Sequence, residues 1–469
     1  MPLMSRLGLL ALFLATLAIL NSCGRTGMGG SSGTASVGGR AISGGGLTGV
    51  GGWASSMGGQ ADAAPQDAAG GTGGAATGPS GDAAWLGSGG ATSGDAAWLG
   101  SGGATTSGDA AWLGSGGATT SADSSAVRVV DVSAGSSLTC AVLSDGSLRC
   151  WGNGLGYGPV PVVVSKISRA IAVSVGSDGG PSGLVASAHV CALIADGSVQ
   201  CWGNNADGQA TGTQSGGDTS PAAVAGITSA VAVSAGGQHT CALLKDGTVQ
   251  CWGSNSNGQL GNGNTSASGP PTAVVGLGGA VQVSAGASHT CARLEDGTVQ
   301  CWGLAPGLNS TPGDIGVSDV VDVSAGYQHS CVVFQDGSVA CWGCLYDSGT
   351  GLGFNCGERP GTARVPSVSQ AVAISTGYKH RCALLVDHSI QCWGNDGNGK
   401  LGIGASDWYA DSGGVNSGLV VGVTQGVKVV VGYDRSCAII ADGSLQCWGA
   451  AAANGGTTSS GVPVPVTGL

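Results

Sequence analysis

The stretch CALLKDGTVQCWG, residues 241–253, decides the fold of this chain. Its two cysteines are separated by nine residues that include Asp-Gly, and Trp-Gly follows the second cysteine. Most copies of this arrangement lie about 50 residues apart, which indicates a protein built from repeats of one supersecondary unit. The arrangement occurs seven times, with His in place of the turn Gly in one copy, and pairs Cys140 with Cys150, Cys191 with Cys201, Cys241 with Cys251, Cys291 with Cys301, Cys331 with Cys341, Cys382 with Cys392 and Cys437 with Cys447.

Short β-prone runs separated by turn residues surround this stretch and predict an all-β unit. In the third copy we expect strands at Ala230–Ser234, His239–Leu244, Thr248–Trp252 and Pro271–Val275, with a turn at 245–247. Seven such four-stranded units, without any helical pattern, predict a seven-bladed β-propeller over residues 126–469.

The length of the turn sets the register of the hairpin. A three-residue loop with Gly247 in the left-handed region places Leu244 opposite Thr248 and Cys241 opposite Cys251. Counting outward, the cysteines fall on a non-hydrogen-bonded site with α-carbons about 4.5 Å apart, within reach of a disulfide. In the sixth copy His388 replaces the turn Gly, so we expect strain there.

The cysteine count predicts an oxidising compartment. Seventeen cysteines, less Cys23, leave an even number, as expected for a disulfide framework. Each hairpin disulfide would contribute roughly 2–3 kcal/mol in the loop-entropy model. The two remaining cysteines, Cys344 and Cys356, are expected to pair across an insertion in the fifth unit.

The segment Val233–Gly261, VSAGGQHTCALLKDGTVQCWGSNSNGQLG, resembles the regulator of chromosome condensation repeat. The shared features are Gly-x-x-His, the Asp-Gly hairpin and the Trp-Gly-x-Asn-x-x-Gly-Gln-Leu-Gly end. The end is complete in the third unit, close in the sixth and degraded in the second. The resemblance implies a seven-bladed propeller that presents a loop face to another protein, and it raises the alternative of guanine-nucleotide exchange activity.

Residues 1–22 are typical of an export signal, with Arg6 followed by the apolar stretch Leu7–Leu20. The tetrapeptide Leu-Asn-Ser-Cys that ends at Cys23 resembles a bacterial lipoprotein cleavage box, which implies lipidation of Cys23 and attachment to a membrane. An ordinary secretory signal beside an unrelated cysteine is the alternative. Both interpretations place the protein outside the cytosol, on the periplasmic or extracellular side.

Residues 23–125 are rich in Gly, Ser, Ala and Thr and are predicted to form a flexible tether. The phrase GDAAWLGSGGAT occurs there three times and repeats a Trp-Leu pair at Trp85, Trp98 and Trp112. We interpret these pairs as a duplicated linker. Contact points for a cell-wall polymer or for the propeller are the alternative.

Composition and charge exclude several functions. A formal charge of −11, with only sixteen Lys and Arg, argues against nucleic acid as a partner. Five of the six histidines stand two residues before the first cysteine of a hairpin, so they repeat once per blade rather than converge on one metal ion. The Cys341-Trp-Gly-Cys344 spacing is that of a dithiol oxidoreductase, but Cys341 is already the expected partner of Cys331. We expect neither a cofactor nor a metal.

Unique sequence occurs only in the loops. Two insertions that follow Trp-Gly stand out, Leu345–Arg364 in the fifth unit and Ile403–Leu419 in the sixth. Because the two insertions follow equivalent positions in adjacent blades, we predict that both lie on one face of the propeller. They carry the aromatic residues that we predict to bind a partner, namely Tyr346, Phe354, Trp408 and Tyr409. Filler that covers its own loop is the alternative.

Together these features predict a non-enzymatic, monomeric propeller that binds or scaffolds a protein or glycan partner at the cell surface or in the periplasm. Besides exchange activity, a polysaccharide-acting propeller enzyme is the other alternative, and it would need two carboxylates that converge in a cleft.

Overall fold

The computed structural model describes residues 127–176, 188–266, 269–304, 309–343, 364–404, 416–451 and 455–469. The chain divides into two units, Met1–Gly90 and Ala91–Leu469, and every described residue belongs to the second. The predicted signal (1–22), Cys23 and the predicted tether (23–125) therefore lie outside the described residues. In the part of the chain that is described, no segment forms an apolar helix of the length that a bilayer requires.

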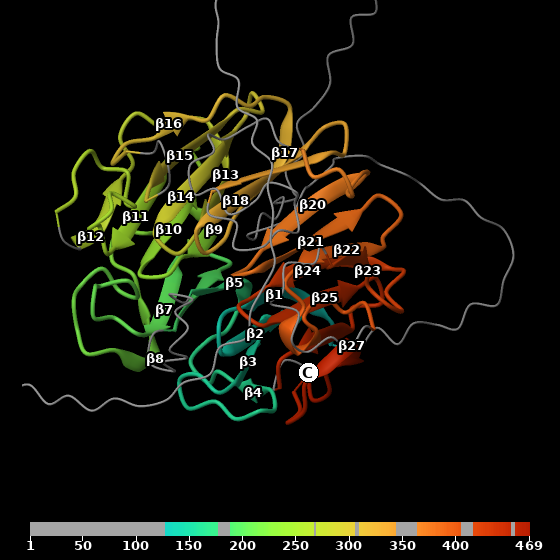
Figure 1. The fold of residues 1–469 in the computed structure, drawn as a ribbon. Coiled ribbons are helices and arrows are strands. Elements are labelled where there is room, and N and C mark those ends of the chain that lie inside the picture. Colours follow the sequence, from blue (N-terminus) through green and yellow to red (C-terminus); the bar gives the residue numbers. More distant parts are fainter. Residues whose placement is uncertain are drawn as a thin grey trace, which may run out of the picture. The chain divides into compact units, whose positions relative to one another are not determined.

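The described part is an all-β propeller of seven sheets, which we number as blades 1 to 7 in chain order (Figure 1). Blade 1 consists of β1 (Val129–Ala134), β2 (Leu138–Leu143), β3 (Leu148–Gly152) and β4 (Val162–Val163). Blade 2 consists of β5 (Ala170–Gly176), β6 (His189–Ile194), β7 (Val199–Gly203) and β8 (Asp218–Ala223). Blade 3 consists of β9 (Ala230–Ala235), β10 (His239–Leu244), β11 (Val249–Gly253) and β12 (Gly269–Ala273). Blade 4 consists of β13 (Ala280–Ala285), β14 (His289–Leu294), β15 (Val299–Gly303) and β16 (Gly313–Asp314).

The remaining blades follow the same order. Blade 5 consists of β17 (Val320–Ala325), β18 (His329–Phe334) and β19 (Val339–Gly343). Blade 6 consists of β20 (Ala371–Thr376), β21 (His380–Leu385), β22 (Ile390–Gly394) and β23 (Asn416–Leu419), with the short 3-10 helix η2 (Gly397–Gly399) after β22. Blade 7 consists of β24 (Gly426–Val431), β25 (Arg435–Ile440), β26 (Leu445–Gly449) and β27 (Ser460–Pro465).

Each sheet is antiparallel and contains consecutive strands only. The first strand of each blade lies next to the propeller axis and the fourth lies at the rim (Figure 1). Six blades have the predicted four strands. Blade 5 has three among the described residues, and an isolated bridge between Ala340 and Arg364 occupies the place of the fourth.

The predicted hairpin register is confirmed. Cys241 pairs with Cys251, the Leu244 N–H donates to the Thr248 carbonyl over 2.8 Å, and Gly247 has a φ of 77°. The third strand begins at Val249, one residue later than predicted, because the Thr248 N–H and hydroxyl both donate to Asp246 Oδ1 and hold Thr248 in the turn.

The fourth strand of blade 3 also differs from the prediction. Strand β12 covers Gly269–Ala273 rather than Pro271–Val275. The Val274 side chain instead enters the core, while its N–H donates to the Val249 carbonyl over 3.0 Å just beyond the strand. Burial of Val274 therefore overrides the pattern that suggested a later strand.

All seven predicted hairpin disulfides are present. Their Cα–Cα distances of 4.0–4.1 Å are somewhat shorter than the predicted value. The sulfurs belong to the hydrophobic core, because every one of these cysteines is buried. The bonds join Cys140 to Cys150, Cys191 to Cys201, Cys241 to Cys251, Cys291 to Cys301, Cys331 to Cys341, Cys382 to Cys392 and Cys437 to Cys447.

Two further predictions about the repeats have different outcomes. Cys344 and Cys356 lie outside the described residues, so their pairing stays a prediction. His388 has a φ of 66°, which confirms that the sixth turn forces a side chain into the left-handed region.

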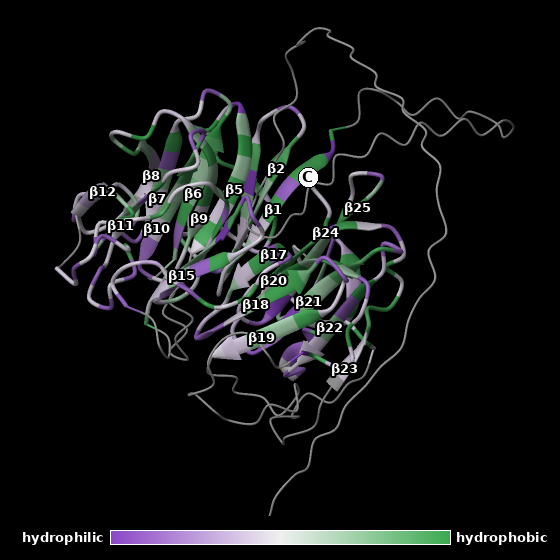
Figure 2. Cartoon of the chain, turned by 90° about the horizontal axis from the view of Figure 1, so that it is seen from above, coloured by the Kyte–Doolittle hydropathy of each residue, from purple (hydrophilic) through white to green (hydrophobic). Residues whose placement is uncertain are grey.

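One tryptophan from each Trp-Gly fills the space between two blades. Apolar side chains concentrate in strands such as β5 and β21 (Figure 2) and form seven clusters, each shared by successive blades. Trp202 of blade 2 packs in the cluster with blade 1 residues, and Trp151 of blade 1 packs with blade 7 residues. The Trp thus stabilises the contact with the preceding blade, and the last cluster closes the ring.

The ring closes without strand exchange between blades 1 and 7 in the described part of the chain. The Val129 N–H of blade 1 donates to the Gly443 carbonyl of blade 7 over 2.9 Å, as Ala230 donates to Gly197 between blades 3 and 2. Lys428 of β24 forms a buried ion pair with Asp131 of β1. Side chains and one recurring backbone bond therefore complete the ring.

Candidate functional site

The four residues predicted to bind a partner, Tyr346, Phe354, Trp408 and Tyr409, lie outside the described residues. The strand ends from which their insertions leave are described. Gly343 at the end of β19 pairs with His329, and Gly394 at the end of β22 pairs with His380. Both strand ends therefore lie on the face that carries the loops between the first and second strands of each blade.

We call these loops the mouth loops, because they surround one end of the central channel. Each begins with a glycine, and we call these residues the throat glycines: Gly135, Gly176, Gly236, Gly286, Gly326, Gly377 and Gly432. Except for Gly135, each lies close to the backbone of the next blade. A Cβ on Gly236 would collide with the Gly286 carbonyl oxygen, and one on Gly432 with that of Gly135. Only glycine allows the seven blades to approach this closely around the axis.

Serine hydroxyls below the throat connect the blades. Ser174 Oγ accepts the Ala235 N–H over 2.9 Å, and Ser234 Oγ accepts the Ala285 N–H over 2.9 Å. This series of serines is interrupted at blade 7, where Val430 occupies the serine position. There the Lys428–Asp131 ion pair links blades 7 and 1 instead. The channel bounded by these residues has a cavity of about 120 Å³.

Three tyrosines distinguish one half of the channel mouth. Tyr327, Tyr378 and Tyr433 directly follow the throat glycines of blades 5, 6 and 7, and we call them the tyrosine arc. The ring centroids of Tyr327 and Tyr378 are 4.8 Å apart in an edge-on arrangement, and those of Tyr378 and Tyr433 are 4.3 Å apart and stacked. Burial raises the pKa of Tyr433, and Tyr378 and Asp434 add to this effect. All three rings are half-buried, so they are held in place while part of their surface remains accessible.

The other half of the mouth has small residues at the same position. Ser136, Gly237 and Ala287 follow the throat glycines of blades 1, 3 and 4, and the equivalent residue of blade 2 lies outside the described residues. Among the described mouth loops, the side chain at this position is thus aromatic in blades 5–7 and small in blades 1, 3 and 4. A ligand at this end of the channel would meet aromatic rings on blades 5–7 and little side-chain bulk on blades 1, 3 and 4.

Polar residues accompany the tyrosine arc. Gln328, Lys379 and Asp434 each follow one of the tyrosines and are half-buried. Lys379 Nζ lies 5.5 Å from the Tyr378 ring centroid, and Lys400 Nζ lies 2.8 Å from Asp434 Oδ1. Aromatic surface and hydrogen-bonding groups therefore alternate along this half of the mouth.

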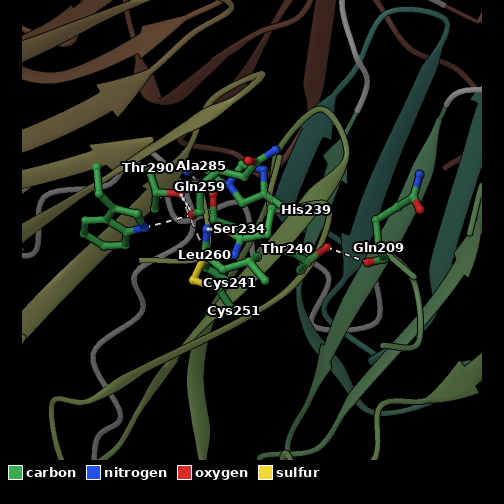
Figure 3. The surroundings of a disulfide bond; sticks show 12 residues. Gln209, Ser234, His239, Thr240, Cys241, Cys251, Gln259, Leu260, Ala285 and Thr290 are labelled. Atoms are coloured by element: carbon green, nitrogen blue, oxygen red, sulfur yellow. Dashed lines mark hydrogen bonds between the residues drawn. A yellow bond between two sulfur atoms is a disulfide. The ribbon is translucent and has the colours of Figure 1, made fainter. Parts of the chain in front are cut away.

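The repeated histidines connect the blades at a contact that we call the seam. His239 Nε2 lies 2.8 Å from the Thr290 hydroxyl of the next blade (Figure 3). His189 makes the same contact with Thr240. The Thr290 hydroxyl in turn donates to the Gln259 carbonyl over 3.1 Å. Since that hydroxyl has only one proton, His239 must donate from Nε2.

The buried histidines have a structural role at the seams. Each is fully buried, and burial lowers the pKa of His189 to about 4 and that of His239 to about 3, so both are neutral at pH 7. In the described ranges, no three His, Cys, Asp or Glu side chains are placed to share a metal ion.

The seams vary in matched pairs. Where Leu138 of blade 1 replaces the histidine, Val190 of blade 2 replaces the hydroxyl residue, and both are completely buried in one apolar cluster. At the seam of blades 7 and 1, Arg435 takes the histidine position and its Nη1 lies 3.4 Å from the Thr139 hydroxyl. Each seam is thus either apolar on both sides or joined by a contact between two polar side chains, with one exception.

The exception is the seam of blades 5 and 6. Arg381 stands there at the hydroxyl position, opposite His329, whose two ring nitrogens have no hydrogen-bond partner among the described residues. Burial, and secondarily the charge of Arg381, lowers the pKa of His329 well below its ordinary value.

The repeated aspartates are also accounted for by the fold. In each hairpin turn the Asp carboxylate accepts hydrogen bonds from the residue two positions later, as Asp246 does from Thr248. Those bonds lower the pKa of the seven turn aspartates, among them Asp145, Asp246 and Asp442. The carboxylates therefore stabilise turns on the face opposite the mouth.

Comparison with known families agrees with this architecture. The family model of the regulator of chromosome condensation (RCC1) repeat matches residues 129–158, 187–209, 230–259 and 320–344, and a second model of the same repeat matches residues 246–293. The protein is a seven-bladed propeller that contains RCC1 repeats in these segments, as its sequence resemblance implied. A search of curated sequences gave no match.

Solved structures with the same fold include Prp20p from Saccharomyces cerevisiae, in a study of its binding to Gsp1p and histones. That structure has a TM-score of 0.55 and 19% identity, and the match covers 70% of this chain and 87% of the other. Yeast RCC1 (Prp20) in complex with Kap60 has a TM-score of 0.56 and 17% identity, with coverage of 78% and 91%. Human WBSCR16 has a TM-score of 0.54 and 20% identity, with coverage of 66% and 85%. At these identities the likeness concerns the fold alone.

Proposed function

We propose that this protein is a non-enzymatic binding module that holds a partner against the mouth of its propeller, outside the cytosol. The tyrosine arc is the observation that carries the proposal. Binding surfaces are enriched in tyrosine, which offers a large apolar ring and a polar hydroxyl at low entropic cost. Here three tyrosines that the repeat does not require gather on one half of one face.

The two insertions that carry the predicted binding residues support the same face. They follow the strand ends Gly343 and Gly394, which lie beside the mouth loops of blades 5 and 6. We therefore retain Tyr346, Phe354, Trp408 and Tyr409 as proposed contributors beside the tyrosine arc. A binding role is further supported because the recurring carboxylates and imidazoles are engaged in turns and seams rather than directed at a common point.

We further propose that the protein is exported to an oxidising compartment and that Cys23 carries a lipid. Seven buried disulfides support it, since such bonds are rare in cytosolic proteins. The resemblance of the tetrapeptide before and including Cys23 to a lipoprotein cleavage box supports the anchor. Alkylation of free thiols in the unreduced, denatured chain tests the first part. We expect the fourteen hairpin cysteines to stay unlabelled, whereas fourteen labelled cysteines would contradict export.

The binding role is tested with the full chain immobilised and exposed to surface extracts of the producing cells. The triple variant Tyr327→Ser, Tyr378→Ser, Tyr433→Ser should lose at least tenfold of the captured material, because it reproduces the small residues of blades 1, 3 and 4. The matched control is Gln238→Ala, in the mouth loop of blade 3. Equal capture by wild type and triple variant would refute binding through the arc.

A further inference from the structure

Among the described residues, the tyrosine arc lies in the part of the mouth that holds most of the nearby positive charge. In blades 6 and 7 the described residues at this end include Lys379, Arg381, Lys400 and Arg435, against the carboxylates Asp396 and Asp434. The chain as a whole has a formal charge of −11. Such a local reversal of sign favours an anionic ligand at this position.

The cations occupy different depths. Lys379 is half-buried, with its ammonium over the Tyr378 ring. Lys400 is buried and paired with Asp434, while Arg435 reaches the Ser136 carbonyl oxygen with Nη2 over 3.4 Å. Burial lowers the pKa of Arg435 to about 10, so it remains charged at neutral pH. The buried cations contribute positive potential, and Lys379 is the one placed to contact a ligand's anionic group.

The size and chemistry of the mouth favour a small ring over a broad protein surface. The cavity of about 120 Å³ is concave; small residues line it on all blades, and the three tyrosines add aromatic rings on blades 5–7 only. A pyranose ring has apolar C–H faces that pack on aromatic rings and a rim of hydroxyls that both donate and accept hydrogen bonds. Gln328 and Asp434 beside the tyrosines offer acceptors, and Gln328 also offers donors.

We propose that the tyrosine arc binds an acidic saccharide, with a sugar ring packed against the tyrosines and its carboxylate directed at Lys379. This proposal rests on the proposed function and specifies the chemical class of the partner. The carboxylate provides orientation, because Lys379 lies on the Tyr378 side of the arc rather than opposite it. Lys379 contributes mainly its positive charge, so an arginine at this position should restore part of the binding.

The test is calorimetric titration of the full, disulfide-bonded chain with a panel of oligosaccharides that carry uronate, sialate or lactyl carboxylates. Each is compared with its uncharged counterpart. We expect at least one acidic member to bind at least tenfold more tightly than its counterpart, and the difference to shrink as salt rises from 20 to about 500 mM, because salt screens exposed charges.

Variants locate the site. Tyr327→Ala and Tyr433→Ala should each weaken binding at least tenfold. Lys379→Gln should weaken the acidic ligand about fivefold, leave its counterpart unchanged, and be partly rescued by Lys379→Arg. Gln238→Ala, at the Lys379 position of blade 3, should change neither affinity. Thermal melting of each variant ensures that a loss of binding reflects the site rather than unfolding.

The outcomes separate the two proposals. If no acidic saccharide binds better than its counterpart, or if Lys379→Gln affects both equally, the acidic saccharide is wrong. If the extracts then still yield a protein that the triple tyrosine variant fails to capture, the binding module stands with a protein partner. If the triple variant captures everything that the wild type does, both proposals fail.

Discussion

The seam of blades 1 and 2 and the seam of blades 3 and 4 have the same backbone geometry and opposite chemistry. At the first, Leu138 and Val190 are packed in an apolar cluster. At the second, His239 donates to Thr290, whose hydroxyl donates to the Gln259 carbonyl. The comparison teaches that, the seam of blades 5 and 6 apart, the repeat tolerates either solution provided that both blades change together, because a buried polar group without a partner costs more than either matched pair.

Acid should have the largest effect on this comparison. The pKa of His189 falls from 6.5 unfolded to about 4 folded, so the unfolded chain takes up protons first. Stability is therefore complete above pH 6.5 and declines as the pH drops toward 4, by roughly 1.4 kcal/mol per pH unit for each such histidine. Burial raises the pKa of Asp322 to about 6, so protonation of Asp322 stabilises the folded chain below pH 6. This gain offsets the loss of stability caused by about one histidine. Thermal melting from pH 7.5 to 4.5 measures the decline.

The double variant His189→Leu, Thr240→Val turns a polar seam into an apolar one. It should therefore reduce the loss of stability per pH unit by the contribution of one histidine. The turn aspartates contribute little over this range, because their ordinary pKa of 3.8 lies below it and folding lowers the pKa further. A stability that does not change between pH 7.5 and 4.5 would contradict the neutral, buried state of the histidines.

A mismatch introduced into the apolar seam should have the next largest effect. Leu138→His buries an imidazole opposite Val190, which offers no acceptor, and we expect a loss of roughly 2–4 kcal/mol in the free energy of unfolding. Adding Val190→Thr supplies an acceptor and should recover part of the loss. Melting temperatures of the two single variants and the double variant measure the coupling, and strict additivity would refute the matched-pair rule.

The reverse mismatch should cost less. Thr290→Val preserves the shape but leaves His239 Nε2 without its acceptor, while Trp302 still donates to the Gln259 carbonyl over 2.8 Å. We expect a loss of about 1–3 kcal/mol. The double variant His239→Leu, Thr290→Val reproduces the apolar seam and should be more stable than Thr290→Val alone. A double variant that melts lower than the single one would show that the two seams are not interchangeable.

The smallest effect concerns the hairpin turns. His388→Gly relieves a side chain at a φ of 66° but removes the contact of His388 Nδ1 with the Gly426 carbonyl oxygen at 3.1 Å. We expect a net gain of roughly 0.5–1 kcal/mol in stability. The matched control Gly247→Ala places a Cβ at a φ of 77° in blade 3 and should lose a similar amount. An unchanged melting temperature in both variants would argue against strain at this turn.

The sequence predicts the fold well because the information lies within single repeats. The Asp-Gly turn and the nine-residue spacing define which residues face each other, and they lead directly to the bond between Cys241 and Cys251. The predicted strand ends are less accurate at Thr248, whose side chain bonds to the turn, and at Val274, whose side chain packs in the core. Those choices depend on packing that a local pattern does not contain.

The tyrosine arc was missed because its members belong to three different repeats. Tyr327, Tyr378 and Tyr433 are variable loop residues in the linear sequence, and only the ring brings them within ring-stacking distance. An alignment of the seven units gives the available signal, a tyrosine after the throat glycine in blades 5, 6 and 7 only. The seam pairs are hidden for the same reason, since Leu138 and Val190 must first be known to face each other.

The uninterrupted course of each blade has a consequence for how such a ring originates. Because every described sheet uses consecutive strands, one blade corresponds to one continuous stretch of coding sequence. A tandem duplication or deletion of that stretch adds or removes a whole blade without breaking any sheet. Ring size can then change in a single genetic event, and the matched seams decide which neighbours a newly copied blade accepts.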